Sequence, residues 1–301
     1  MVVVPIIVPE ETSTRRRWAL AALMCSTVGD MANHVDRDTK LCISLAARPS
    51  HHGVRFHNWL YERLGLNFVY KAIAPLDITA AVAGIRGLDI RGAGVSMPYK
   101  QDVIPLIDSL HPSAERINAV NTIVNNDGVL TGYNTDYVAV ASLLRSHEVS
   151  PTLSVAVRGS GGMANAVVAA LADHGLVGTV VARNAVTGEA LAQQYGWSYA
   201  ESVPHNSEML VNVTPLGMTG SDQDAQAFTD EEINAASLIF DVVAYPIETP
   251  LVLAAQRLGK RVINGGEVVA LQAAEQFALY TGIQPSSADV AEAERYAQSP
   301  A

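Results

Sequence analysis

The stretch SVAVRGSGGMANAVVAAL, residues 154–171, decides the fold. Ser154–Arg158 is short and β-branched, which predicts a buried strand, and Met163–Leu171 has Ala and Val at helical spacing. Gly159–Gly162 breaks the chain between them. A strand, a glycine turn and a helix open a βαβ unit in which backbone N–H groups approach a pyrophosphate at the helix N-terminus. The spacing alone also fits an ordinary tight turn, so a dinucleotide site is one of two interpretations.

A second strand follows at Gly178–Arg183, where a dinucleotide fold places the residue that reads the ribose, ~20 residues after the glycines. An NAD site usually has a carboxylate there, but this chain has none before Glu189. Arg183 offers a planar fork of donors that suits a 2′-phosphate. The residue therefore favours NADP over NAD, with a solvated strand-end charge as the alternative.

Composition excludes several classes of protein. The 301 residues are 49% hydrophobic, enough for one large or two medium domains. The net charge of -10 argues against a nucleic-acid surface, and no apolar stretch reaches the ~20 residues of a membrane span. Cys25 and Cys42 form no disulfide framework, and neither they nor the adjacent His51 and His52 have metal-site spacing. We expect no metal, no nucleic acid and no membrane partner.

The first residues do not match the rest of the chain. A basic cluster, Arg15–Arg17, precedes a short apolar run, Trp18–Cys25, as in a signal peptide. The run is short, and no small-residue cleavage site follows it cleanly. We expect residues 1–33 to be a poorly ordered extension, or Met31 to be the natural start, of a cytoplasmic enzyme.

Strand and helix patterns alternate along the remaining chain, which predicts mostly parallel α/β sheets. We expect a two-domain α/β fold: residues 34–136 as a mostly parallel substrate domain and 137–265 as a Rossmann-like nucleotide domain. A C-terminal helix, 266–301, packs back onto the first. The expected strands are 40–45, 67–73, 90–96, 119–124, 129–133, 154–158, 178–183, 209–213, 238–243 and 261–263. The expected helices include 56–64, 78–87, 101–109, 137–147, 163–171, 187–195, 250–258 and 268–281.

Polar residues gather where predicted strands end, which is where open α/β sheets bind ligands. A Lys beside an Asp can move the proton of an alcohol, because the carboxylate holds the ammonium while the amine takes the hydroxyl proton. Lys100 and Asp136 are the candidates, although each alone also fits a surface charge. Neighbouring polar candidates are Ser96, Asn121 and Gln272.

Several motifs occur together and in order, and with them the chain resembles the shikimate dehydrogenase family over roughly residues 40–285. That family has NV[ST]xPxK, AVNT, NTD and GxGGxxxA blocks in the same order. Here the corresponding segments are VSMPYK at 95–100, AVNTI at 119–123, YNTD at 133–136, GSGGMANA at 159–166, NVTPLGM at 212–218 and Gln272 within VVALQAAEQF.

The resemblance implies an active site in the cleft between two domains. It implies that Lys100 and Asp136 are the catalytic pair, that Ser96, Asn121 and Gln272 bind the polyol, and that Arg183 reads NADP. We add Ser160 and Gly265 to the phosphate-loop and nicotinamide-loop matches. The predicted cofactor residues are then Gly159, Ser160, Gly161, Gly162, Arg183, Asn212, Thr214, Gly217, Met218 and Gly265.

The sequence departs from the family pattern in two places, and both concern substrate. The family's Ser-x-Ser-Pro block, which holds the shikimate carboxylate, is replaced by LAARPSHHGVRFHN, residues 45–58. A buried carboxylate needs donors. Ser44 and Arg48 are the substitutes that we predict, with Ser50 and Arg55 as alternatives. Ala244 stands where the family has a substrate-contacting tyrosine. Cofactor binding thus matches the family while substrate recognition is altered.

These features predict an NADP-dependent dehydrogenase, a monomer or homodimer, that interconverts shikimate and 3-dehydroshikimate or acts on a close relative. One alternative is a dehydrogenase of quinate, aminoshikimate or another alcohol with weak activity on shikimate. Another is a non-catalytic dinucleotide-binding regulator, although a pure binder has no need of Lys100 and Asp136.

Overall fold

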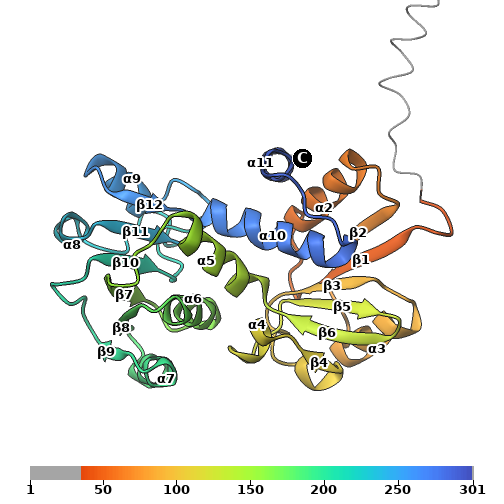
Figure 1. Cartoon of the computed structure of the whole chain (residues 1–301), viewed down its shortest axis with the longest axis horizontal. Coiled ribbons are helices and arrows are strands. Elements are labelled where there is room, and N and C mark those ends of the chain that lie inside the picture. The colour runs from red at the N-terminus through yellow and green to blue at the C-terminus, as the bar shows by residue number, and fades with distance from the viewer. Residues whose placement is uncertain (1–34, 300–301) are drawn as a thin grey trace, which may run out of the picture.

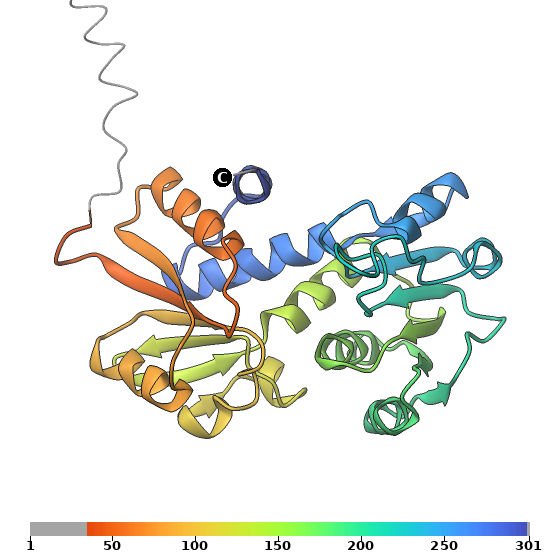
Figure 2. The same cartoon turned by 180° about the vertical axis from the view of Figure 1, so that it is seen from behind.

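The protein has two six-stranded sheets joined by two long helices, as a computed structural model describing residues 35–299 shows (Figure 1). Helices α5 (Thr135–Ser146) and α10 (Gly265–Thr281) pack side by side between the sheets (Figure 2). The predicted two-part α/β fold is confirmed. The expected extension, residues 1–33, lies outside the described residues, and the predicted domain boundaries stay a prediction.

The N-terminal sheet is mixed. Its three first strands run parallel because helices α2 (His52–Arg63) and α3 (Ile78–Gly87) cross over between them. One strand, β5, runs antiparallel to both of its neighbours. In spatial order the strands are β2 (Phe68–Ile73), β1 (Lys40–Leu45), β3 (Gly92–Val95), β5 (Thr122–Asn126), β6 (Val129–Tyr133) and β4 (Ser109–Leu110).

The hairpin between β5 and β6 has local causes. Asp127 and Gly128 both have positive φ, 53° and 87°. Two consecutive positive φ angles are what a two-residue type I′ turn requires, and its twist matches that of the flanking strands. The turn therefore sets the antiparallel pairing of β5 and β6.

The predicted helix over 101–109 is wrong. The segment instead holds turns, a single 3₁₀ turn η1 (Ile104–Leu106) and the short strand β4, and a four-residue helix α4 (Pro112–Glu115) follows it. Pro105 explains the difference, because proline in the interior of an α-helix removes a hydrogen bond and clashes with the preceding turn. Val103 is nevertheless fully buried, so the apolar residues of the segment still pack on the sheet.

The C-terminal sheet is parallel throughout. Its strands, in spatial order, are β12 (Arg261–Ile263), β11 (Leu238–Asp241), β10 (Met209–Asn212), β7 (Ser154–Arg158), β8 (Val177–Val181) and β9 (Ser198–Ala200). The helices that pack with it include α6 (Gly162–Asp173), α7 (Ala185–Tyr195), α8 (Asp230–Ala235) and α9 (Pro250–Arg257). The short elements β9 and α8 were not predicted.

Both faces of this sheet are buried, which explains why its strands are apolar without alternation. Val155 and Val157 of β7 belong to the core on the α6 side. Ala156 belongs to the core on the opposite side, with residues of α8 and α9. Because side chains alternate along a strand, Arg158 continues the face of Ala156.

The C-terminal segment 266–301, expected as one helix, holds two: the helix expected over 268–281 is present, and a second one follows it. Gly282 ends α10 with a left-handed φ of 75°, and α11 (Ser287–Gln298) then folds onto α2. An ion pair and a hydrogen bond join these two helices: Arg63 Nε lies 3.2 Å from Asp289 Oδ1, and His52 Nε2 lies 2.9 Å from Glu294 Oε2. The expected return to the N-terminal part is present. None of the helices in residues 35–299 is long and apolar enough to cross a membrane.

Candidate active site

Lys100 and Asp136 meet. Lys100 lies in the turn after β3, and Asp136 lies in the first turn of α5. Lys100 Nζ donates to Asp136 Oδ2 over 2.6 Å, and the two side chains are 32% and 16% exposed. A short charge-assisted bond thus holds an ammonium that solvent and ligands can still reach.

Asn134 fixes where α5 begins. Its side-chain oxygen accepts from the Tyr137 N–H at 3.0 Å, which caps the helix. Its amide nitrogen donates to the Ala119 carbonyl at 3.0 Å, and its own N–H donates to Ser113 Oγ at 3.0 Å. Because Asn134 is 1% exposed and bonded on every side, the turn that carries Asp136 has one position.

Asn121 is oriented by its oxygen. Oδ1 accepts from the Thr135 N–H at 2.8 Å, from Thr122 Oγ1 at 2.9 Å and from Thr135 Oγ1 at 3.2 Å. The oxygen is fully used, so the NH₂ group is what the side chain has left to offer a ligand. Two glutamines of α10 join the same network: Gln272 Nε2 donates to Thr135 Oγ1 at 3.1 Å, and Gln276 Nε2 donates to Thr122 Oγ1 at 2.9 Å.

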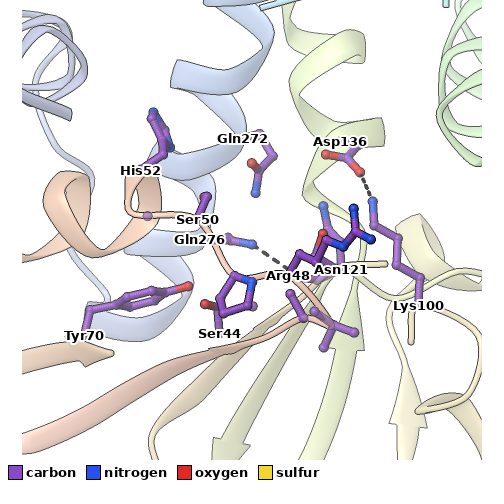
Figure 3. Close-up of a pocket in the computed structure, with 16 residues that line it drawn as sticks. Ser44, Arg48, Ser50, His52, Tyr70, Lys100, Asn121, Asp136, Gln272 and Gln276 are labelled. Atoms are coloured by element: carbon purple, nitrogen blue, oxygen red, sulfur yellow. Dashed lines mark hydrogen bonds and ion pairs between the residues drawn. The ribbon is translucent and has the colours of Figure 1, made fainter. Parts of the chain in front are cut away.

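These groups surround one cavity of about 340 Å³ (Figure 3). Every residue predicted to act on or bind substrate lines it, from segments far apart in the chain. They are Ser44, Arg48, Ser96, Lys100, Asn121, Asp136 and Gln272. Their assembly at one place is a fact of the structure, whereas their individual roles stay predictions.

The floor of the cavity is the face of the N-terminal sheet that carries Ser44, Tyr70 and Gly94. A Cβ at Gly94 would lie 2.9 Å from the Tyr70 hydroxyl oxygen and 3.6 Å from Ser44 Cβ, so the glycine leaves room for the tyrosine. Tyr70 is 4% exposed, and burial raises its pKa well above the ordinary value. It therefore stays a neutral hydroxyl at physiological pH.

The cavity carries excess positive charge. Asp136 is the only carboxylate among its lining residues, and it is paired with Lys100. Arg48 also lines the cavity, and within residues 35–299 its side chain has no hydrogen-bond or ion-pair partner. An unpaired guanidinium beside a polar cavity suits an anionic ligand.

A second cavity, of about 410 Å³, opens at the carboxyl ends of the C-terminal strands. Gly159 lines it with a φ of +124°, and a Cβ there would lie 2.8 Å from Val213 Cγ2. Gly161 precedes α6 without a side-chain cap, so the first N–H groups of the helix are left for a ligand. The predicted cofactor residues that line this cavity are Gly159, Ser160, Gly161, Arg183 and Thr214.

The other predicted cofactor residues do not line this cavity: Gly162, Asn212, Gly217, Met218 and Gly265. Asn212 is completely buried, and its Oδ1 accepts from the N–H and Oγ1 of Thr214 at 3.0 and 2.6 Å. It therefore shapes the loop after β10 instead of offering a free polar face. A Cβ at Gly265 would lie 2.2 Å from the Val243 carbonyl oxygen, so this glycine allows α10 to start against that loop.

Comparisons with known proteins show the family of this chain. A model described as the shikimate dehydrogenase substrate-binding domain matches residues 50–123. A shikimate dehydrogenase-like protein of Haemophilus influenzae is 48% identical over 268 residues, which are 88% of this chain and 99% of that one. The chain belongs to the shikimate dehydrogenase family. The resemblance seen in the sequence is confirmed.

Solved structures of relatives show the same fold. A shikimate 5-dehydrogenase of Thermus thermophilus, in complex with NADP(H) and shikimate, has a TM-score of 0.76 at 29% identity, over 86% of this chain and 99% of that one. A quinate dehydrogenase of Corynebacterium glutamicum, in complex with NAD, has a TM-score of 0.77 at 27% identity, over 86% and 98%. Proteins of the shikimate dehydrogenase family thus bind NADP or NAD.

Of the two places where this chain departs from the shikimate dehydrogenase pattern, the replaced serine block lies at the cavity wall. His52 lines the cavity, and its Nε2 contacts both oxygens of the buried Glu294, at 3.0 and 2.9 Å. Ala244 is buried, but the neighbouring Tyr245 is 41% exposed, and its ring lies edge-on to the His52 ring at 6.0 Å. A tyrosine from the C-terminal part thus contacts the lining residue His52 without itself lining the cavity.

Sequence reasoning missed three polar lining residues: His52, Tyr70 and Gln276. Tyr70 had a usable signal, because alternation puts it on the same face of β2 as Ala72, which pairs with Ser44. Gln276 lies four residues after Gln272 on one helix, hence on the same face. His52 had no comparable local signal.

Proposed function

We propose that this chain is an NADP-dependent dehydrogenase of a cyclic polyol carboxylic acid, shikimate or a close relative such as quinate or an aminoshikimate. The observation that carries the proposal is the 2.6 Å contact between Lys100 Nζ and Asp136 Oδ2 inside a polar cavity with excess positive charge. We propose that residues 34–136 bind the substrate and residues 137–265 the nucleotide.

Lys100 acts as the acid–base group. In the oxidative direction its amine takes the proton of the substrate hydroxyl while the carbon that bears this hydroxyl becomes a carbonyl carbon. NADP, when bound, accepts the hydride from that carbon. In the reverse direction the Lys100 ammonium returns the proton to the carbonyl oxygen. Asp136 keeps the Lys100 side chain in place through the short bond between them.

The neighbouring side chains orient the ring. The NH₂ group of Asn121 and the side-chain oxygen of Gln272 are suited to bind substrate hydroxyls, because their other polar atoms are used within the protein. Ser96 supplies a further hydroxyl at the end of β3. Ser44 on the floor and Arg48 above it hold the carboxylate, in the place of the missing serine block.

Two features of the second cavity support NADP. Gly159 and Gly161 leave space for a backbone-bound pyrophosphate. Arg183 lines the same cavity and has no hydrogen-bond or ion-pair partner among residues 35–299, so its guanidinium is available for a 2′-phosphate.

The altered carboxylate region also favours a second candidate, a dehydrogenase that acts only weakly on shikimate and prefers a different alcohol. His52, Arg48 and Ser50 line the cavity where the family pattern has its serines. A wall with one guanidinium and further polar side chains fits an acid whose carboxylate lies differently from that of shikimate.

Steady-state kinetics on the full chain test the proposal. NADPH formation is measured with shikimate, quinate and an aminoshikimate, and with a neutral ring polyol of the same size. We expect turnover of at least one acid, with the neutral polyol far slower. Turnover of shikimate below that of another acid selects the second candidate. Binding of NADPH without turnover of any substrate would instead indicate a dinucleotide-binding regulator.

A further inference from the structure

The second cavity, which Arg183 lines, has a further arginine in its wall that no motif predicted. Arg158 is the last residue of the central strand β7 and directly precedes the glycine turn. Its register partners are Asn212 in β10 and Val181 in β8. Its side chain lies on the face of Ala156 and Val181, opposite to α6, and it lines the cavity together with Arg183.

The Arg158 guanidinium is held but not neutralised. Its Cζ lies 5.0 Å from the centre of the Phe228 ring, a cation–π contact with a side chain that is 2% exposed. Its Nε is buried without a hydrogen-bond partner. A buried donor without an acceptor is costly, so such a group in a cavity wall indicates a ligand that supplies the acceptor.

Nearby carboxylates do not fill this role. Glu201 and Asp222 line the same cavity, but neither forms an ion pair with Arg158 among residues 35–299. Four arginines in this described part of the chain make no side-chain hydrogen bond or ion pair, and three of them line the two cavities. They are Arg48, Arg158, Arg183 and Arg295.

We infer that Arg158 binds the 2′-phosphate of NADP together with Arg183, so that two guanidinium groups share one phosphate. The inference rests on the proposed function, because it requires NADP in this cavity. Arg183 follows the register partner of Arg158 by two residues, and adjacent strands lie ~4.8 Å apart, so two arginine side chains on this face can reach one group.

The geometry separates this phosphate from the pyrophosphate. The pyrophosphate is expected at the N-terminus of α6, which lies on the other face of the sheet from Arg158. Phe228 keeps the Arg158 guanidinium in one position before the ligand arrives, which lowers the entropy lost on binding. Arg158 is therefore a residue that determines NADP over NAD.

Calorimetric binding of NADPH, NADH, 2′,5′-ADP and 5′-AMP to the full chain, without substrate, tests the inference. The wild type is expected to prefer NADPH. Arg158→Met should weaken NADPH and 2′,5′-ADP more than tenfold, or about 1.4 kcal/mol, and leave NADH and 5′-AMP within about twofold. Arg158→Lys, which keeps the charge but not the fork, should lose less. Arg295→Met, a change of the same kind on α11, should alter nothing.

A double variant sharpens the result. If Arg158 and Arg183 share one phosphate, Arg158→Met and Arg183→Ala together should weaken NADPH by less than the product of their single effects. Equal loss of NADPH and NADH, or no loss of either, would overturn the inference while leaving the cofactor proposal intact. A wild type that binds NADPH no better than NADH would overturn the cofactor proposal and the inference with it. Should Arg158→Met fail to fold, Arg158→Lys gives the same comparison.

Discussion

At the scale of single residues, unpaired cationic side chains indicate that the cavities bind anionic ligands. Arg48 stands beside the Lys100–Asp136 pair without a partner of its own among residues 35–299 (Figure 3). A carboxylate that enters this cavity loses its hydration, and it needs charged or hydroxyl donors in return. Arg48 and Ser44 are the residues placed to supply them.

Arg48→Ala or Ser44→Ala should therefore raise the KM for the acid by the equivalent of about 1–3 kcal/mol, while the Kd for NADPH is unchanged. A neutral analogue without the carboxylate should bind the wild type more weakly than the acid does, by the same free energy. The variants should bind this analogue almost as well as the wild type does. Arg37→Ala, which removes a highly exposed arginine, is the matched control. If both variants bind the acid as well as the wild type, the carboxylate is held elsewhere or the substrate is not an acid.

His57 makes the fold sensitive to acid. It is 1% exposed, stacks on the Tyr70 ring at 4.4 Å, and burial lowers its pKa to about 3. The unfolded chain takes up a proton near the ordinary histidine pKa, whereas the folded protein excludes that proton until about pH 3. Acid thus favours the unfolded state over the interval between these two pKa values.

His57→Phe should flatten this dependence. Between about pH 6 and 4, the free energy of unfolding of the wild type should fall by about 1.4 kcal/mol per pH unit more steeply than that of the variant. Denaturant unfolding at several pH values measures both slopes. His205→Ala, which removes an exposed histidine, should keep the wild-type slope. Parallel curves for wild type and His57→Phe would show that His57 is protonated in the folded state.

At the scale of elements, α10 depends on a close approach at its first residue. A Cβ on Gly265 would meet the Val243 carbonyl carbon at 2.3 Å and its oxygen at 2.2 Å, and backbone atoms cannot move aside cheaply. Because α10 carries Gln272 and Gln276, this contact also positions one wall of the substrate cavity.

Gly265→Ala should lower the free energy of unfolding by about 1–3 kcal/mol, the usual effect of overpacking. Gly84→Ala adds the same methyl group inside α3, where nothing lies within 4 Å, and should instead stabilise the helix by up to about 1 kcal/mol. Thermal unfolding of both variants gives the comparison. A Gly265→Ala variant as stable as the wild type would contradict the prediction and would mean that the start of α10 can shift freely.

Local patterns were enough for most elements. Three elements have the bounds that their apolar runs and the residues flanking them predict. They are the strands Lys40–Leu45 and Ser154–Arg158 and the helix Ile78–Gly87. The prediction of a helix after Lys100 is wrong because it follows the apolar spacing, whereas Pro105 excludes an α-helix there. At the chain end, the helix over 268–281 stops before Gly282 as its pattern predicts, but the separate helix α11 after it was not predicted.

The site was partly predictable for a different reason. Residues at strand ends, such as Ser44 and Lys100, follow from the rule that parallel strands end at one edge. The contact of His52 with Glu294 joins residues far apart in sequence, and neither has a local pattern that announces the other. Arg158 was hidden because a charge at the end of a strand has the same appearance whether it is solvated or buried against Phe228.

At the scale of the whole molecule, the two cavities lie at the carboxyl ends of strands in different sheets. Helices α5 and α10 join those sheets (Figures 1 and 2). Asp136 belongs to the helix that leaves the N-terminal sheet, and Lys100 to that sheet's loop. The proposed catalytic pair therefore stands where a substrate in one cavity could face a nicotinamide held by the other part of the chain.

The kcat of Lys100→Ala, measured with NADP and the acid that the wild type oxidises fastest, tests this account most directly. We predict a fall of about 10²–10⁴, the usual contribution of a positioned acid–base group, with the Kd for NADPH within about twofold of the wild type. Lys71→Ala, which removes an exposed lysine of β2, should keep full activity. A Lys100→Ala variant that turns over within a few fold of the wild type would contradict the account, because the proton would then move through another group.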